Sequence, residues 1–184
     1  MIPKIIHQVW IGDEIPDDYS ECIESVKEHF SDWEYKLWLN DDNRQFIKDN
    51  FKWFLDTYDG YEEDISRADA VRYFQLYKYG GMYMDMDIEV YEKFDRLLSK
   101  PICYLFPFIH RDYFKIKGWE TILSNCMMAT MPRHEFFEKI ILHLKSDIVY
   151  KMLADKDDDL MTVFAKAGPT FLTKMYDWSY LCTK

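Results

Sequence analysis

The sequence predicts a single α/β domain over residues 1–184, with a mixed, mainly parallel central sheet flanked by helices. Two patterns predict this class. A strand, a helix and a strand follow one another at the N-terminus, and in mid-chain an amphipathic helix leads through two glycines into a strand. The chain has 184 residues, of which 48% are hydrophobic. That is enough for one well-formed core and leaves little room for a second domain.

The N-terminal strand, helix and strand occupy residues 2–11, 18–30 and 35–39. The first strand is β-rich and mostly apolar, which is typical of a strand covered on both faces in a parallel sheet. A right-handed crossover makes the two strands parallel. The residues at their ends, including Val9, Trp10 and Asn40, therefore meet at the C-terminal edge of the sheet, where open α/β sheets bind ligands.

The mid-chain segment is predicted to be a capped helix followed by a strand. Ser66 stands three residues before Asp69, the spacing of a capping box that begins a helix over residues 67–79. Gly80 closes this helix. After the glycines, apolar residues recur at every second position, which predicts a half-buried strand. The other face of that strand carries three carboxylates, those of Asp85, Asp87 and Glu89.

These three carboxylates predict a metal site. They lie about 7 Å apart along one strand face, so neighbouring charges repel by about 0.6 kcal/mol in water, and a cation is favoured there. Hard oxygen ligands suit Mn²⁺ or Mg²⁺, and such an ion keeps positions open for phosphate oxygens. Asp85 and Asp87 are therefore candidate ligands of a metal-diphosphate site. The alternative is an exposed acidic strand face with no further role.

The remaining elements follow from the same periodicities. Helices are predicted at 42–58, at about 133–146 and near 159–166, β-rich runs at 102–109 and 121–130, and a last amphipathic piece after Gly168 and Pro169. No Gly-rich phosphate loop follows either early strand, so neither a dinucleotide fingerprint nor a P-loop is present. A metal ion is therefore expected to hold the phosphates.

Composition excludes several function classes. The formal net charge is −10 without a basic stripe, so binding to nucleic acid or anionic lipid is not favoured. The five histidines lack the paired spacing of a zinc site. Four cysteines without a Cys-x-x-Cys pair favour a reducing compartment, and we expect a cytoplasmic protein. No apolar run approaches the roughly 18 residues of a membrane span.

Two stretches of the chain resemble a sugar-transferase family with a DXD motif: IPKIIHQVWIG at the start and SRADAVRYFQLYKYGGMYMDMD at residues 66–87. That family includes polysaccharide mannosyl- and galactosyltransferases and is related to the glucosylating toxins. Ten positions of the family pattern match, namely Ser66, Asp69, Arg72, Leu76, Tyr77, Gly80, Gly81, Tyr83, Asp85 and Asp87. The resemblance implies a GT-A type nucleotide-sugar fold, a divalent metal ion and retention of anomeric configuration.

The resemblance also implies roles for two residues of the helix. Asp69 matches the aspartate that binds the donor sugar, and Arg72 matches the arginine beside the sugar and phosphate. Each has a structural alternative. Asp69 completes the predicted capping box, and Arg72 lies at the i, i+3 spacing of an ordinary ion pair with it.

Five further residues are assigned by the same resemblance. Val9 and Trp10 match the strand that binds the nucleotide base, although a tryptophan at a strand end also suits the core. Asn40, after the second strand, is a further candidate for the base site. Tyr83 fits a tyrosine near the phosphates, with packing in the strand as its alternative. Asn125 resembles a residue on the acceptor side of the donor site.

We therefore expect a metal-dependent, retaining glycosyltransferase that moves a hexose from a nucleotide diphosphate sugar to a glycan, a glycoprotein or another hydroxyl acceptor. UDP-glucose is the first donor to test. Asp69, Arg72, Asp85 and Asn125 are the expected catalytic residues, with Mn²⁺ or Mg²⁺ on Asp85 and Asp87. Two alternatives stay open, a non-catalytic carbohydrate-binding domain and a metal-dependent phosphohydrolase that uses Asp85 and Asp87 as nucleophile and acid.

The resemblance further suggests that the chain is part of a longer polypeptide or works beside one. The family normally supplies another metal ligand from a C-terminal loop after a late Gly-Pro turn, which Gly168 and Pro169 resemble. Only Phe171 to Lys184 follow that turn here. Their candidate ligands are Asp177 and Ser179, on either side of Trp178.

Overall fold

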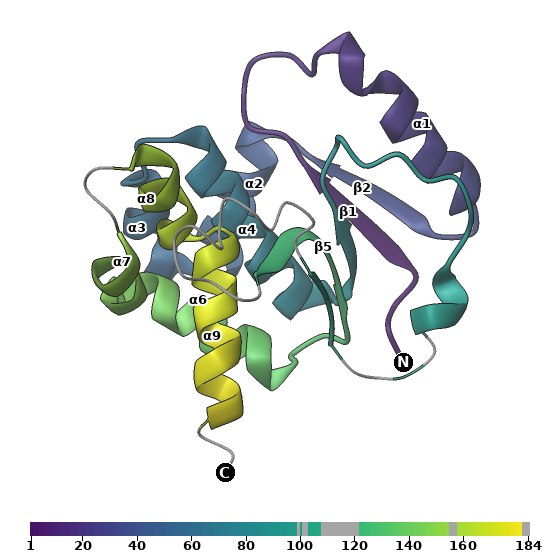
Figure 1. Ribbon diagram of the computed structural model, residues 1–184. Coiled ribbons are helices and arrows are strands. Elements are labelled where there is room, and N and C mark those ends of the chain that lie inside the picture. The colour runs from purple at the N-terminus through teal and green to yellow at the C-terminus, as the bar shows by residue number, and fades with distance from the viewer. Residues whose placement is uncertain (99, 101–102, 108–121, 155–157, 182–184) are drawn as a thin grey trace.

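The computed structural model describes residues 1–98, 100, 103–107, 122–154 and 158–181, which form a mixed sheet flanked by helices (Figure 1). The five described strands are β1 Ile5–Val9, β2 Glu34–Trp38, β3 Gly81–Met84, β4 Tyr104–Pro107 and β5 Leu123–Thr130. They stand in the order β2-β1-β3-β5-β4. Strand β1 pairs in parallel with β2 and β3, and β5 runs antiparallel to β3 and β4. The predicted α/β class with a mixed sheet is confirmed.

The helices cover the two faces of the sheet unequally. The α-helices are α1 Ser20–His29, α2 Asn40–Asn50, α3 Leu55–Asp59, α4 Asp64–Tyr79, α6 Glu135–Ser146, α7 Ile148–Leu153, α8 Asp159–Lys166 and α9 Pro169–Leu181. Short 3₁₀ turns cover Asp17–Tyr19, Lys52–Phe54 and Asp95–Leu98. Figure 1 shows α1 on one side of the sheet and the other labelled helices on the opposite side. Ile6 of β1 packs with Val26 of α1, whereas Val9 packs in the core that contains Phe74 of α4.

The prediction of a single helix over residues 42–58 is wrong. This segment is divided into α2, a 3₁₀ turn and α3, and the break falls at Phe51, where φ is −141° and ψ is 47°. The Phe51 ring packs edge-on against Phe74 at a centroid distance of 4.9 Å, and Phe54 is fully buried. The break follows from packing, because it lets both rings enter the core.

The predicted capping box of Ser66 and Asp69 is also wrong. Helix α4 begins at Asp64 with Glu63 as its N-cap residue, so Ser66 and Asp69 both lie inside the helix. The Lys166 ammonium donates to both carboxylate oxygens of Glu63, at 2.7 and 2.6 Å, and fixes Glu63 ahead of the helix. A partner 103 residues away therefore sets the start of α4, and no local spacing could reveal it.

The prediction of an acidic strand face is also wrong, because β3 ends at Met84. Asp85 still donates its backbone N–H to the carbonyl of Cys126, at 2.7 Å. The chain then turns at Met86 and Asp87 and leaves the sheet. Val90, which is 5% exposed, packs in the core on the α1 side. Asp85 thus stands at the strand end and Asp87 in the turn, rather than two steps along one strand.

Two glycines let α4 and β1 approach β3 closely. Gly80 and Gly81 have φ of 65° and 94°, in the region that favours glycine. A Cβ atom at Gly81 would lie 2.4 Å from the Ile5 carbonyl oxygen. The helix-to-strand turn is therefore available only to glycine, and it brings the start of β3 beside the start of β1.

His7 of β1 is held neutral in this same region. Its Nε2 lies 2.9 Å from the Gly80 carbonyl, so Nε2 donates, and its Nδ1 accepts from the Trp38 indole at 3.1 Å. The side chain is fully buried. Burial lowers the pKa of His7 to about 4, against about 6.5 in an unfolded chain.

This pKa predicts a pH-dependent loss of stability. Between pH 6.5 and 4 the unfolded chain binds a proton at His7 that the folded protein does not, so the free energy of unfolding falls as pH falls through this window. The full loss is about 3 kcal/mol. Denaturant unfolding at several pH values measures it, with His7→Gln as the variant that lacks the titrating ring. Identical pH dependence in both proteins would contradict the assignment.

The described cysteines are consistent with isolated thiols. Cys22, Cys103 and Cys126 are free, and Cys182 lies outside the described residues. Within the described part of the chain, no helix combines the length and the apolar character that crossing a membrane requires.

Candidate active site

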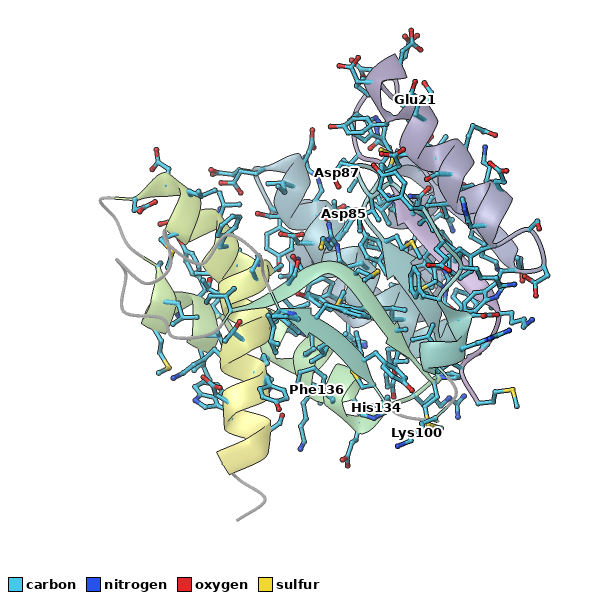
Figure 2. All side chains as sticks on the ribbon, turned by 45° about the vertical axis from the view of Figure 1, so that its right-hand side comes forward. Glu21, Asp85, Asp87, Lys100, His134 and Phe136 are labelled. Carbon is cyan, nitrogen blue, oxygen red and sulfur yellow. The ribbon has the colours of Figure 1, made fainter. Side chains whose placement is uncertain are left out.

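A pocket of about 460 Å³ opens at the C-terminal ends of β1 and β3, the edge where ligands bind in open α/β sheets. Eight of the predicted site residues line it, namely Val9, Trp10, Asp69, Arg72, Tyr83, Asp85, Asp87 and Asn125. Figure 2 shows Asp85 and Asp87 between α1 and the helices of the opposite face. The structure thus brings together residues that lie up to 116 positions apart in the sequence.

Arg72 is the centre of a buried network in this pocket. Its guanidinium contacts Asp69 Oδ1 at 2.9 Å and Asp85 Oδ1 at 3.0 Å. It also donates to the carbonyl of Asn125 at 2.9 Å and lies 4.4 Å from the centroid of the Tyr83 ring. The Arg72 side chain is only 5% exposed. The fork of the guanidinium therefore fixes the two carboxylates relative to each other.

The two carboxylates each keep one oxygen for a ligand. Asp69 Oδ1 accepts from Asn125 Nδ2 at 2.8 Å as well as from Arg72. Asp85 Oδ1 accepts from the Tyr83 hydroxyl at 2.7 Å as well as from Arg72. Within the described residues, neither Oδ2 atom makes a polar contact. Asp69 thus belongs to the buried network, and the i, i+3 ion pair that was the structural alternative for Arg72 is present within it.

Burial sets the electrostatics of the network. It raises the pKa of Asp85 to about 6, against the lowering effect of Arg72 and the Tyr83 hydroxyl. Burial likewise raises the pKa of Asp69. Burial alone would lower the pKa of Arg72, but the surrounding anionic groups, led by Asp85, raise it overall. Two carboxylates against one guanidinium leave the site with an excess of negative charge, which favours a cation.

The other end of the pocket is aromatic. The rings of Trp10 and Tyr19 lie 5.6 Å apart between centroids, at 56°. Trp10 Nε1 is buried and has no hydrogen-bond partner in the described part of the chain. Asn40 is placed outside the pocket, where its side chain bonds both backbone groups of Gly12, at 3.1 and 2.9 Å. Asn40 therefore shapes the loop after β1 rather than facing the cavity.

Several lining residues were missed by sequence reasoning. Besides Tyr19, they are Ile11, Asp64, Ile65, Ala68, Met86, Ser124, Cys126, Phe164 and Pro169. Those of α4 share a helix face with Asp69 and Arg72, so the helical period would have found them had the helix start been placed correctly. Pro169 follows the Gly-Pro turn, where a Cβ atom at Gly168 would lie 3.1 Å from Asp69 Oδ2. Gly168 thus lets that turn form the wall beside Asp69.

The carboxylate oxygens at the end of β3 are suitable ligands for a hard divalent cation. Asp85 Oδ2 and the exposed carboxylate of Asp87 provide oxygen ligands, as Mn²⁺ and Mg²⁺ prefer. Among the described residues no group of three His, Cys, Asp or Glu side chains is close enough to hold a metal. Asp177 and Ser179 do not supply the missing ligand, because they lie along α9 outside the pocket, Asp177 about 12 Å beyond Pro169.

This incomplete ligand set gives a prediction for metal binding. Two carboxylates leave most of the coordination shell to water or to diphosphate oxygens. We expect Mn²⁺ to bind weakly to the free protein and much more tightly when a nucleoside diphosphate is present. Calorimetric titration with and without the nucleotide measures this difference. Tight binding to the nucleotide-free protein would show that two carboxylates are not the whole site.

Comparisons with known proteins agree on the class of this chain. Residues 16–102 match the family described as glycosyltransferase sugar-binding region containing DXD motif. Mannosyl phosphorylinositol ceramide synthase SUR1 of Saccharomyces cerevisiae is 36% identical over 176 residues, and inositol phosphoceramide mannosyltransferase 2 of Schizosaccharomyces pombe is 33% identical over 178 residues. Each alignment covers 96% of this chain but only 42% and 47% of the relative. The chain therefore spans less than half the length of these two relatives.

Solved structures show the same fold at low sequence identity. The PaToxG glycosyltransferase superposes with a TM-score of 0.63 at 16% identity, covering 95% of this chain and 68% of its own. The UDP-bound glycosyltransferase domain of the YGT toxin gives a TM-score of 0.57 at 10% identity, with coverage of 99% and 78%. The predicted GT-A type fold is confirmed by these likenesses.

Proposed function

We propose that this chain, whose residues 16–102 match the family of glycosyltransferases with a DXD motif in the sugar-binding region, transfers a hexose from a nucleoside diphosphate sugar to a hydroxyl group. The observation that carries the proposal is the Arg72 bridge between Asp69 and Asp85. It engages Oδ1 of each carboxylate and leaves both Oδ2 atoms for ligands, which supports a sugar contact at Asp69 and a metal contact at Asp85.

The proposal divides the pocket among three parts of the donor. The base lies against Trp10 and Tyr19, whose rings form the aromatic end. The diphosphate lies at Asp85 and Asp87 beyond β3. The hexose lies near Asp69, whose Oδ2 accepts a hydrogen bond from a sugar hydroxyl. A buried carboxylate acceptor discriminates well among hydroxyl positions, because a sugar that cannot donate leaves it unpaired.

Asp85 and Asp87 would hold a divalent ion, which when bound neutralises charge on the diphosphate. Arg72 keeps Asp85 in position, and Tyr83 holds the same oxygen from the other side. Four contacts already engage Arg72, leaving at most one of its five N–H groups for the donor. In this proposal Arg72 mainly positions the carboxylates, and its direct contact with phosphate is limited to that one group.

The retaining outcome is part of the proposal. Among the described residues that line the pocket there is no histidine, and Asp69 Oδ1 is held by Arg72 and Asn125. In this proposal an oxygen of the departing diphosphate takes the proton of the acceptor hydroxyl as the new glycosidic bond forms and the bond from the sugar to phosphate breaks.

The relatives bear on the choice of sugar. Two relatives at 36% and 33% identity carry mannosyl transfer in their names, so we place GDP-mannose ahead of UDP-glucose as the donor. Their names also indicate inositol phosphoceramide as an acceptor, and we propose an acceptor of the same chemistry, a polyhydroxylated ring. A longer polypeptide, as in those relatives, would complete the enzyme.

A donor panel tests the proposal. The protein is incubated with Mn²⁺ and with GDP-mannose, UDP-glucose or UDP-galactose, and the free nucleotide is followed with time. Slow hydrolysis of one donor supports a transferase. Phosphate release from simple monoesters would instead support the phosphohydrolase, and binding of sugar without turnover would support the non-catalytic binding domain.

A further inference from the structure

A second cavity of about 460 Å³ lies among the helices, lined by the turn between α3 and α4 and by parts of α6 to α9. We call it the helical cavity and define it by Tyr61, Glu62, His143, Asp147, Tyr150 and Phe171. Its volume falls within the range of about 300–1,000 Å³ that small-molecule sites occupy. Within the described chain it is distinct from the donor pocket, since the two share no lining residue.

The lining of the helical cavity combines an aromatic ring with side chains that form hydrogen bonds. Tyr61 and Tyr150 supply hydroxyls, and Phe171 supplies a buried ring. His143 donates from Nδ1 to the Lys139 carbonyl at 2.8 Å, and its Nε2 remains for a ligand. Rings that pack against C–H groups, next to groups that bond hydroxyls, are the surroundings that a sugar or a cyclitol requires.

The charges of the helical cavity favour a neutral ligand over an anion. Lys166 lines it, but Glu63 neutralises this cation through both carboxylate oxygens, at 2.7 and 2.6 Å. The carboxylates of Glu62 and Asp147 have no ion pair among the described residues. These carboxylates accept hydrogen bonds from hydroxyl groups and repel phosphate.

The helical cavity adjoins the donor pocket along two segments of the chain. Glu62 lines the helical cavity, and Asp64, two residues later, lines the donor pocket. In the same way, Pro169 lines the donor pocket and Phe171 lines the helical cavity. Residues two apart lie within about 7 Å of each other. Tyr61 lines the helical cavity. Burial raises its pKa, and the negative charges of Asp147 and Asp69 raise it further.

We propose that the helical cavity binds a neutral polyhydroxylated ring of the acceptor, a pyranose or an inositol. This inference rests on the proposed glycosyl transfer and names a site for the acceptor that the DXD motif does not define. The cavity adjoins the donor pocket at Glu62–Asp64 and at Pro169–Phe171, so a ring bound there would hold the rest of an acceptor close to the donor.

Binding is measured by saturation-transfer NMR and calorimetry on the full chain, with excess GDP or UDP to fill the donor pocket. The probes are myo-inositol, the methyl α-glycosides of glucose, galactose and mannose, and myo-inositol 1-phosphate as the anionic counterpart. We expect roughly millimolar binding of at least one neutral ring, unaffected by the nucleotide. Binding of pyranosides alone assigns a glycan acceptor, and binding of inositol alone assigns an inositol headgroup.

Two variants and a matched control localise the binding. Asp147 has φ of 51°, which glycine adopts without strain, so Asp147→Gly removes the carboxylate and keeps the backbone. We expect it to weaken ring binding about tenfold, and Tyr150→Phe to weaken it less. Met152→Ala, at a 56% exposed position of the same helix α7, should leave binding unchanged.

The outcomes separate this inference from the proposed function. Donor hydrolysis is followed on the same samples, since water as acceptor needs no helical cavity. Hydrolysis without ring binding overturns the inference alone, and ring binding without hydrolysis overturns the proposed transfer but not the site. Tighter binding of inositol 1-phosphate than of inositol, competition by the nucleotide, or unchanged binding in Asp147→Gly would each overturn the helical cavity as a neutral acceptor site.

Discussion

Replacing Asp87 with alanine is expected to lower turnover about a hundredfold or more while leaving the fold intact. Asp87 is exposed in the turn after β3 and makes no hydrogen bond or ion pair within the described residues. Its removal therefore changes the free energy of unfolding by no more than about 0.5 kcal/mol. A large catalytic loss is expected because, in the proposed function, Asp87 is one of the two DXD carboxylates that would hold a divalent ion against the leaving diphosphate.

The matched control is Glu89→Ala, which removes a carboxylate from the next exposed position of the same segment. Glu89 does not line the pocket, so turnover should stay at the wild-type value. Donor hydrolysis measures the rates, and thermal melting checks the fold of both variants. Equal rates in Asp87→Ala and wild-type protein would refute the assignment of the metal to this turn.

Replacing Arg72 with methionine is expected to destabilise the protein by about 3–5 kcal/mol. The variant leaves Asp69 and Asp85 without their shared cation, and the Asp69 side chain is only 6% exposed. Removing one partner of a buried ion pair costs more than the pair itself contributes, because the remaining charge is desolvated and uncompensated. Denaturant unfolding measures the loss, and donor hydrolysis should fall with it because Asp85 loses its position.

A double variant separates the charge from the packing. In Arg72→Met with Asp69→Asn, one uncompensated carboxylate is gone, so the double variant should be more stable than Arg72→Met alone, by about 1 kcal/mol or more. Arg72→Lys restores a charge but not the planar fork that reaches both carboxylates, so intermediate stability is expected. A free energy of unfolding unchanged in Arg72→Met would disprove the buried bridge.

The sequence by itself determined the features that rest on local chemistry. A β-rich, mostly apolar run predicted β1, and the 3.6-residue period predicted most of the helices, because that period decides which face of a helix is buried. The two glycines predicted the turn into β3, since only glycine accepts φ of 65° and 94° there. The motif from Ser66 to Asp87 identified five of the residues that line the pocket, before any contact between them was known. They are Asp69, Arg72, Tyr83, Asp85 and Asp87.

The tertiary structure alone decided how these residues are used. The Lys166 contact to Glu63 set the start of α4 and made Asp69 a network residue instead of a cap. The departure of the chain toward the α1 side ended β3 at Met84 and separated Asp85 from Asp87. Each of these outcomes depends on partners distant in the sequence, such as Lys166 and Cys126. Local spacing has no information on such contacts, because the energy that decides them comes from burial and pairing in the assembled fold.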